Sequence, residues 1–467
     1  MFTSLKKSFW NISCEEVQNL KKRMSASNVI ILGFLAIILV GTLLLVMPIS
    51  SKTGEFTNPI TALFTATSAT CVTGLITVDT GLYWSAFGKG VVLLLIQIGG
   101  LGFMSLAMVF SALLKRRVSV REQTLFLSSM NLDPYSDLAS FAYRVTLFAF
   151  GAEGLGALLL SFRFVPEFGF GKGVVYSVFH AVSAFCNAGF DILGGEFGAF
   201  SSISNYADDW YLNLVLIGLI LSGGLGFVVW DDIFAFFKRR SKISLYTKII
   251  LGYSAILVFG GALVIAVAEW NNGDFMGNGN AGTKILRSLF QSVTLRTAGF
   301  AAADQAALGE GTRLFSMMLM FVGGNSGSTA GGIKITTLAI VFASTFSIIR
   351  GEGDAVMFRR RIENDTVRRA FALFVIGLVV VATGGFFLMV VDGLPISDAY
   401  FEVFSAFGTV GITVGITPSL SPASRMVIIG LMFFGRIGIT SVMYAILVRS
   451  NQERAPMRFA RLGLPVG

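Results

Sequence analysis

The sequence predicts an all-α protein that crosses a membrane several times and is built from four similar repeats. Three observations predict this fold class. Only 13% of the 467 residues are charged, about half the roughly 25% of a soluble domain, and the mean hydropathy is +0.74. Apolar stretches such as 29–47 and 371–391 have the roughly 20 residues that cross a bilayer core of about 30 Å. A shorter apolar pattern ending in glycine recurs at a near-constant interval.

The net charge of +9 is compatible with nucleic-acid binding, but the placement of the basic residues argues against a nucleic-acid partner. The basic residues form clusters between the apolar segments, at 21–23, 115–117, 238–240 and 359–361, and at Arg449, Arg454 and Arg458. Such clusters mark the cytoplasmic ends of membrane helices. The three cysteines, Cys14, Cys71 and Cys186, are too few and too scattered for a disulfide framework.

A basic cluster follows every second long apolar segment, which predicts pairs of spans that run out of the cell and back. We expect eight spans, at 28–47, 91–113, 141–161, 211–237, 248–269, 314–349, 369–391 and 424–448. The sequence therefore predicts a multi-pass protein of the inner (plasma) membrane with both termini in the cytoplasm.

Between the two spans of each pair lies a short apolar segment that runs from a phenylalanine to a glycine. The four segments are 64–74, 179–189, 290–299 and 401–411. A helix of about 11 residues rises only about 16 Å, so it cannot span and must turn back. The third segment is one residue shorter than the others. We expect four repeats of span, re-entrant helix, glycine loop and span, at 1–113, 114–240, 241–350 and 351–467.

Four glycine loops gathered around one axis would line an aqueous path, because irregular backbone at membrane depth must face protein or water. Their carbonyl groups could replace the hydration shell of a cation, and the C-terminal ends of the half-helices would favour positive charge. The expected ion-binding filter is Val72, Thr73, Gly74, Asn187, Ala188, Gly189, Thr297, Ala298, Gly299, Thr409, Val410 and Gly411. Asp79, Asp191 and Asp304 follow three of the glycines; they either concentrate cations at the outer mouth or are ordinary solvated loop residues.

The loops resemble those of the potassium transporter superfamily that includes the Trk, Ktr and plant HKT proteins. Over nearly the whole chain the sequence is most similar to the membrane subunit of bacterial Ktr systems, through 295–300 (LRTAGF), 327–334 (GSTAGGIK) and 434–438 (FGRIG). This resemblance implies potassium uptake through a gated pore rather than an enzyme, with sodium coupling left open. Some plant members have serine at the first filter position and move sodium, so Gly74 supports potassium selectivity.

The resemblance also implies a homodimer in the lipid bilayer and a cytosolic ring of separate nucleotide-binding regulatory subunits. Potassium would be the substrate, no cofactor would bind this chain, and a nucleotide would act only through the partner. The basic loops and the tail 461–467 are candidate docking surfaces. Two alternatives remain open: a less selective sodium/potassium transporter, and a secondary transporter for a different solute. Such transporters usually have inverted repeats, whereas these repeats are parallel and favour a cation.

The sixth span is interrupted by a glycine-rich run that we expect to be unwound, since glycines and hydroxyl residues destabilise a lipid-facing helix. The expected gate loop, 323–335, comprises Gly323, Gly324, Asn325, Ser326, Gly327, Ser328, Thr329, Ala330, Gly331, Gly332 and Lys334. Below the filter it would act as a movable gate, as the resemblance also implies, or it is a passive kink for close helix packing.

Charged residues inside spans are functional candidates by default. We expect Arg436 to hold the gate loop closed through its carbonyls, and Lys334 to slow cations below the filter. Interhelical salt bridges are the alternative for these two and for Glu153. Arg296 is expected to brace the third loop from behind, because a guanidinium facing the path would repel cations. His180 is expected to be structural.

Overall fold

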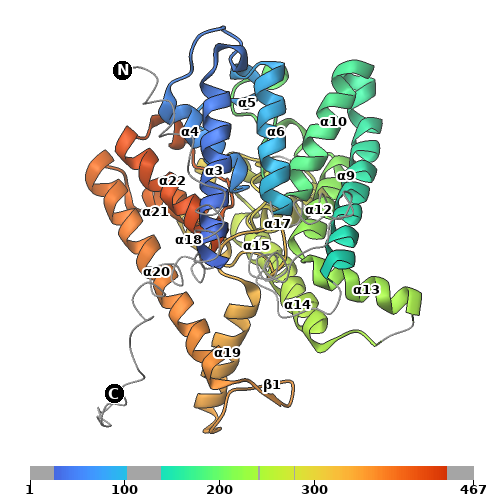
Figure 1. Cartoon of the computed structure of the whole chain (residues 1–467), viewed down its shortest axis with the longest axis vertical. Helices are drawn as coiled ribbons and strands as arrows, with labels where there is room; N and C mark the ends of the chain where they lie inside the picture. Colours follow the sequence, from blue (N-terminus) through green and yellow to red (C-terminus); the bar gives the residue numbers. More distant parts are fainter. Residues whose placement is uncertain (1–25, 103–137, 240–241, 278, 439–467) are drawn as a thin grey trace, which may run out of the picture.

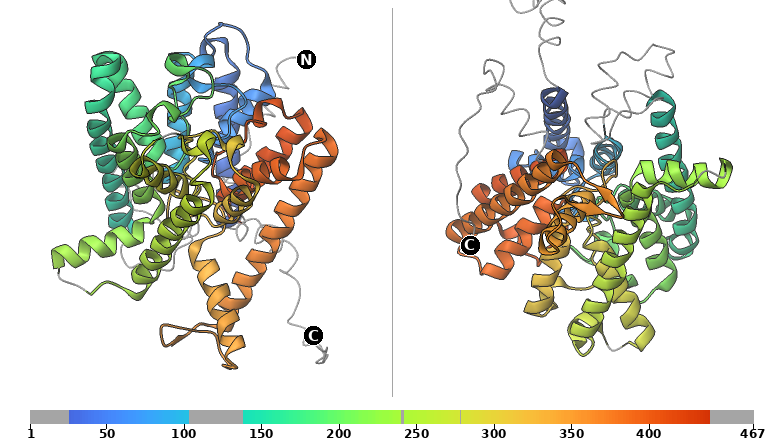
Figure 2. Two further views of the ribbon diagram at one scale, coloured as in Figure 1. Left: turned by 180° about the vertical axis from the view of Figure 1, so that it is seen from behind. Right: turned by 90° about the horizontal axis from the view of Figure 1, so that it is seen from below.

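The computed structural model describes residues 26–102, 138–239, 242–277 and 279–438. Within them the chain is a bundle of helices with one small hairpin at its lower end (Figure 1). The hairpin pairs β1 (Val356–Met357) with β2 (Arg360–Arg361) in antiparallel fashion. It joins two helices that extend beyond the rest of the bundle (Figures 1 and 2).

The first helix of each expected pair is long and apolar. These helices are α3 (Ala26–Val46), α9 (Leu138–Phe168), the continuous run of α14 (Leu245–Ala255), η3 (Ile256–Gly260) and α15 (Gly261–Glu269), and α20 (Asn364–Asp392). By length and composition, four helices of the described ranges can cross a membrane, or five if one bent pair counts as a single span. The chain is therefore a helical, multi-pass membrane protein.

The second helix of each pair ends inside the expected span, at residue 101, 224, 321 or 437. These helices are α6 (Ala86–Leu101), α12 (Trp210–Gly224), α18 (Glu310–Phe321) and α22 (Pro422–Ile437). The expected span at 211–237 is not one straight helix, because the chain bends by 100° between α12 and α13 (Phe227–Arg239). The expected spans 91–113 and 424–448 extend beyond the described residues.

A glycine with a positive φ angle follows three of these helix ends. Gly102, Gly226 and Gly438 have φ angles of 75°, 92° and 84°, which other residues adopt only at a cost. The sixth span is broken between Phe321 and α19 (Ile335–Ile349), where the structure places an irregular segment, as the glycine-rich sequence predicted.

A short, largely buried helix follows each long first helix and ends a few residues before one of the four glycines. These short helices are α4 (Pro59–Thr70), α10 (Phe170–Phe185), α17 (Ala281–Thr294) and α21 (Ile396–Gly408). The phenylalanine that opens each sequence segment is a core residue: Phe64, Phe179, Phe290 and Phe401 are at most 3% exposed. The remaining short elements are η1 (Pro48–Ser50), α5 (Thr80–Tyr83), α11 (Gly194–Phe197), η2 (Ser204–Tyr206), α16 (Gly273–Met276), η4 (Gln305–Ala307) and η5 (Thr417–Ser419).

Contacts between the second helices and the short helices close a ring. α6 packs against α10, α12 against α17, α18 against α21, and α22 against α4. Each second helix thus contacts the short helix that comes next along the chain, and the last one returns to the first. This arrangement brings the C-terminal ends of the four short helices toward one centre.

Candidate functional site

The four glycine loops share one unusual backbone conformation. In each loop the glycine and the residue two positions before it have positive φ angles. The pairs are Val72 (57°) and Gly74 (97°), Asn187 (59°) and Gly189 (67°), Thr297 (67°) and Gly299 (84°), and Thr409 (52°) and Gly411 (90°). A non-glycine residue in this region is strained by roughly 1–3 kcal/mol, and such strain clusters at functional sites. Its fourfold recurrence indicates that the orientation of this backbone matters.

The loops converge in a ring, although their glycines lie more than 100 positions apart in the chain. A Cβ atom built on Gly74 would lie 2.5 Å from the carbonyl oxygen of Ala188, and one on Gly189 would lie 2.8 Å from that of Ala298. A Cβ on Gly299 would lie 2.6 Å from the Val410 oxygen. One on Gly411 would collide with the Thr73 oxygen, which closes the ring. The structure therefore brings all four expected segments together, with a backbone carbonyl group between each pair of neighbouring loops. Rings of backbone carbonyl groups can coordinate dehydrated cations.

A hydroxyl group on each short helix supports its loop. Ser68 Oγ accepts a hydrogen bond from Gly74 N at 3.0 Å, and Ser405 Oγ accepts one from Gly411 N at 3.1 Å. In the other two loops Ser183 donates to the Phe190 oxygen and Thr294 donates to the Phe300 oxygen, each at 2.7 Å.

Thr294 lies five positions before its glycine, whereas the three serines lie six positions before theirs. The shorter third segment therefore keeps its hydroxyl support by moving the hydroxyl residue one position closer to the glycine.

Glycines on the second helices hold the short helices close, and sequence reasoning missed them. A Cβ on Gly99, Gly223 or Gly435 would collide with the carbonyl oxygens of Thr70, Phe185 and Phe407, respectively. Each of these oxygens belongs to the residue four positions before a ring glycine. Glycine-rich sequence near the end of each second span was the available signal, because small residues let membrane helices approach closely.

A second missed residue is Glu402 on α21, which is fully buried. Its Oε1 atom accepts hydrogen bonds from Thr413 and, at 3.0 Å, from Thr417. Both threonines follow the fourth glycine, so this carboxyl group ties the end of the loop back to its short helix. An acidic residue next to the repeated phenylalanine was the sequence signal.

The irregular segment after α18 lies directly against the ring. The hydroxyl group of Thr329 donates to the Phe185 oxygen at 3.3 Å, and the backbone nitrogen of Thr329 donates to the Gly223 oxygen. A Cβ on Gly331 would collide with the side chain of Thr409. The segment thus contacts the second and fourth loops at once.

Arg436 on α22 contacts this segment, as the sequence predicted. Its guanidinium donates to the carbonyl oxygens of Thr329 and Gly99, and to that of Gly100 at 3.1 Å. Lys334 donates to the Ala330 oxygen at 2.8 Å. Arg436 therefore joins the segment to the end of α6.

The alternative of interhelical salt bridges for Arg436, Lys334 and Glu153 is wrong within the described ranges, where none of the three forms one. Instead both oxygens of Glu153 accept from Gln97 Nε2, at 3.0 and 3.1 Å, and Cys186 Sγ lies 3.7 Å from Oε1. A neutral amide can satisfy a buried carboxyl group through hydrogen bonds.

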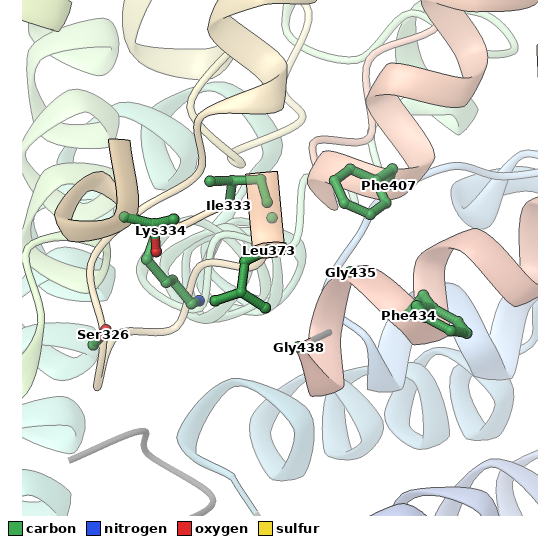
Figure 3. A pocket seen from close by; sticks show the side chains of 10 residues that line it. Ser326, Ile333, Lys334, Leu373, Phe407, Phe434, Gly435 and Gly438 are labelled. Carbon is green, nitrogen blue, oxygen red and sulfur yellow. The ribbon is translucent and has the colours of Figure 1, made fainter. Parts of the chain in front are cut away.

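A cavity of about 170 Å³ lies beside the irregular segment. Ile333 and Lys334 line it from the segment, Leu373 from α20, Phe407 from α21 and Phe434 from α22 (Figure 3). The segment therefore has unfilled space between itself and α20, α21 and α22.

Two of the aspartates expected at the outer mouth are buried. Asp79 accepts backbone hydrogen bonds from Leu82 and Phe200, each at 2.7 Å, and Asp191 accepts one from Leu193. Asp79 and Asp191 are 6% and 7% exposed, so they are not ordinary solvated loop residues. Asp304 is exposed and caps η4, so it is the one aspartate of the three that is an ordinary solvated loop residue.

Burial, and the nearby charge of Asp79, raise the pKa of Asp191 from 3.8 to about 7. Because the folded pKa is above the unfolded one, the folded state loses stability as pH rises toward 7. We expect the Tm of the wild type in detergent to fall more between about pH 4 and about pH 8 than that of Asp191→Asn. Asp304→Asn, at an exposed carboxyl group, should keep the wild-type profile. Identical pH profiles for wild type and Asp191→Asn would contradict the assignment.

Arg296 and His180 are placed as expected. Arg296 donates to the Ser254 oxygen on α14 at 3.4 Å, so it contacts the helix behind the third loop. His180 Nδ1 lies 2.7 Å from the Tyr176 oxygen, and the imidazole packs near Phe164 and Phe300. No group of three or more His, Cys, Asp or Glu side chains suited to a metal occurs in the part of the chain described. The ring offers backbone carbonyls instead.

Comparisons with known proteins show what the chain is similar to in sequence and in fold. A family model described as "TrkH: Cation transport protein" matches residues 1–455. The chain is 39% identical to the potassium/sodium uptake protein NtpJ of Enterococcus hirae, covering 96% of this chain and 99% of that protein. It is 39% identical to the Ktr system potassium uptake protein B of Bacillus subtilis, covering 94% and 96%, respectively. The structure is similar to that of the potassium transporter TrkH from Vibrio parahaemolyticus, with a TM-score of 0.71, 17% identity, and coverage of 90% and 85%.

Proposed function

The chain belongs to the TrkH family of cation transport proteins, and on this premise we propose that it carries potassium ions into the cell through a gated pore. The two relatives at 39% identity are named a potassium/sodium uptake protein and a potassium uptake protein. The observation that carries the proposal is the closed ring of four glycine loops with backbone carbonyls between neighbours. A fixed ring of carbonyl dipoles replaces the hydration shell of a monovalent cation without adding net charge.

The filter in this proposal consists of the twelve residues named from the sequence, three in each loop. It is supported by the shared backbone conformation and by the hydroxyl groups behind it. The four repeats 1–113, 114–240, 241–350 and 351–467 and the eight spans are supported by the closed ring of helix contacts. Both termini would lie in the cytoplasm, on the side of the basic clusters.

The gate in this proposal is the segment 323–335 with Arg436. In the described position the segment contacts two loops of the ring and is held by the guanidinium and by backbone bonds to α12. This position corresponds to the closed state. Opening requires these bonds to break and the segment to move, and the neighbouring cavity provides room for that movement.

The assembly in this proposal is a homodimer in the plasma membrane that binds a cytosolic ring of nucleotide-binding regulatory subunits. The name "Ktr system" of the Bacillus subtilis relative supports a partner. The exposed arginines of β2 offer a basic surface at the lower end of the bundle (Figure 1). No cofactor is assigned to this chain, and a nucleotide would act only through the partner.

Ion flux in liposomes that contain only this chain tests the proposal. We expect potassium or rubidium to accumulate in the liposomes down a gradient, at a rate above that of protein-free liposomes. An organic anion or neutral solute should not be taken up. Equal rates with and without protein for every cation would overturn the proposal.

A second candidate function is less selective transport of both sodium and potassium. It is favoured by one observation, the name "potassium/sodium uptake protein" of the Enterococcus hirae relative. The same liposome assay separates the two candidates, because equal sodium and potassium rates support the second. Coupling of potassium flux to a sodium gradient is measured by adding sodium to one side only.

Replacing Ser405 by alanine is expected to weaken potassium preference over sodium by about fivefold. The substitution removes the hydroxyl that accepts from Gly411 N, and a buried donor left without a partner costs about 1–3 kcal/mol. Competitive uptake of the two ions in liposomes measures the change. Ser419→Ala removes a hydroxyl in the outer loop that donates to the Ile416 oxygen, so it should leave the preference unchanged. Unaltered preference in Ser405→Ala would contradict the role.

A further inference from the structure

Helix α13 lies across the bundle rather than along it. It bends away from α12 by 100° and extends sideways beyond the other helices (Figures 1 and 2). Phe234 and Phe237 on this helix are 51% and 77% exposed, and Lys238 near its end is also exposed. A helix with exposed aromatic residues and basic residues that lies across membrane spans is typical of the membrane interface.

A cavity of about 420 Å³ lies between α9 and α13. Its wall is formed by Phe141, Val145 and Phe148 of α9 and by Trp230 and Phe234 of α13. The volume falls within the roughly 300–1,000 Å³ of small-ligand sites. An apolar, aromatic cavity of this size at the edge of a membrane protein suits a hydrocarbon chain.

The edge of the cavity carries a net positive charge. Arg144 donates to both oxygens of Asp231, at 2.7 and 3.3 Å. The neighbouring carboxylate, Asp232, accepts from Ser244 N at 2.8 Å and therefore faces α14. Asp231 is paired with Arg144 and Asp232 is bonded to Ser244, so the charged group at the cavity that a ligand would meet is the ammonium group of Lys238. An apolar cavity with a basic group at its edge complements a phospholipid, whose acyl chain is apolar and whose headgroup carries a negatively charged phosphate.

The start of α13 is bonded to the proposed gate segment. Phe227 N donates to the Gly327 oxygen at 2.8 Å, and Asn325 Nδ2 donates to the Leu225 oxygen at 3.0 Å. Trp230 Nε1 donates to the Ser222 oxygen at 2.8 Å, which holds α13 at a set angle to α12. Trp230 lies three positions after Phe227 on α13, so a ligand that contacts Trp230 contacts the helix whose first residue is bonded to the segment.

We propose that the cavity between α9 and α13 binds an anionic phospholipid, with its acyl chain against Trp230 and its phosphate on Lys238. The bound lipid holds α13 in the described position and thereby stabilises the bonds from α13 to the gate segment. Anionic lipid then lowers basal ion flux. The effect on flux rests on the proposed function, whereas lipid binding does not.

Quenching of Trp230 fluorescence tests the binding site. Bromine atoms on an acyl chain quench a nearby indole, and the difference between wild type and Trp230→Phe isolates this one signal. We expect brominated phosphatidylglycerol to quench Trp230 about fivefold more strongly per mole than brominated phosphatidylcholine, the factor that corresponds to roughly 1 kcal/mol for one basic residue near an anionic surface. Lys238→Ala should lose this preference, and Lys248→Ala, an exposed lysine on α14, should keep it. Equal quenching by the two lipids would overturn the site.

Flux in liposomes of the two lipids tests the link to the gate. We expect basal flux through the wild type to be several-fold lower with phosphatidylglycerol than with phosphatidylcholine, and Lys238→Ala to remove the difference. A flux that is the same in both lipids, together with selective quenching, would overturn the link. Absence of any flux with selective quenching retained would count against the proposed function and not against the lipid site.

Discussion

Replacing Gly74 by serine is expected to reduce potassium uptake at least about tenfold and to abolish growth of a potassium-uptake-deficient bacterium at low potassium. Gly74 has a φ angle of 97°, and a Cβ there would lie 2.5 Å from the Ala188 oxygen. A side chain in this conformation costs about 1–3 kcal/mol, and the neighbouring carbonyl must also move. Because that carbonyl belongs to the next loop, the displacement would reach a second part of the proposed filter.

The matched control for this substitution is Gly415→Ser. Gly415 has a φ angle of 94°, close to that of Gly74, but nothing lies within 4 Å of a Cβ built on it. The control therefore introduces the same backbone strain without the collision and should retain most of the uptake. Rubidium uptake, corrected for the amount of protein in the membrane, measures both variants. Equal losses in the two variants would show that strain alone explains the effect, and wild-type growth of Gly74→Ser would refute the filter assignment.

Replacing Arg436 by alanine is expected to raise basal ion flux about tenfold or more. The guanidinium donates to Thr329 in the gate segment and to Gly99 and Gly100 at the end of α6. A hydrogen bond to a charged group contributes about 1.5–3 kcal/mol, and the loss of one such bond shifts an equilibrium by a factor of roughly 10–100. Since these bonds hold the segment against the ring, their removal should favour the open position. Flux in liposomes without the regulatory partner measures the effect.

Arg425→Ala is the control for this second substitution. Arg425 lies on the same helix, α22, and also donates to a backbone oxygen, that of Pro418, at 2.8 Å. Its partner belongs to η5, away from the gate segment. Basal flux in this variant should remain within about twofold of that of the wild type, which corresponds to a free-energy difference of less than about 1 kcal/mol. If both arginine variants leave basal flux unchanged, Arg436 does not hold the gate.

Local sequence patterns were sufficient to predict the main elements of the site. The recurrence of phenylalanine, a hydroxyl residue and glycine identified the four short helices and the loops that follow them. The glycine-rich run after α18 predicted an interrupted helix, and the structure has an irregular segment there. The resemblance to Ktr proteins is confirmed by the family match and by relatives at 39% identity. These features were predictable because each depends on a few neighbouring residues.

The break between α12 and α13 shows the limit of such patterns. Residues 211–237 are apolar enough to be one span, and Gly226 alone does not reveal a bend of 100°. In the fold the break is stabilised by Phe227 N donating to Gly327 and by Trp230 donating to Ser222. The first of these partners lies 100 positions away in the chain, so sequence could not show that the bend would be stable.

The sequence by itself determined that this is a helical membrane protein with four glycine loops at a near-constant interval. It also determined the family, because motifs and apolar periodicity are local properties of the chain. Only the tertiary structure decided which carbonyl groups lie next to each of the four glycines, that Arg436 also contacts Gly99 of α6, and that Glu153 contacts Gln97. The physical reason is that a buried polar group takes whichever partner packing brings within about 3 Å. Those partners come from segments that are far apart in the chain.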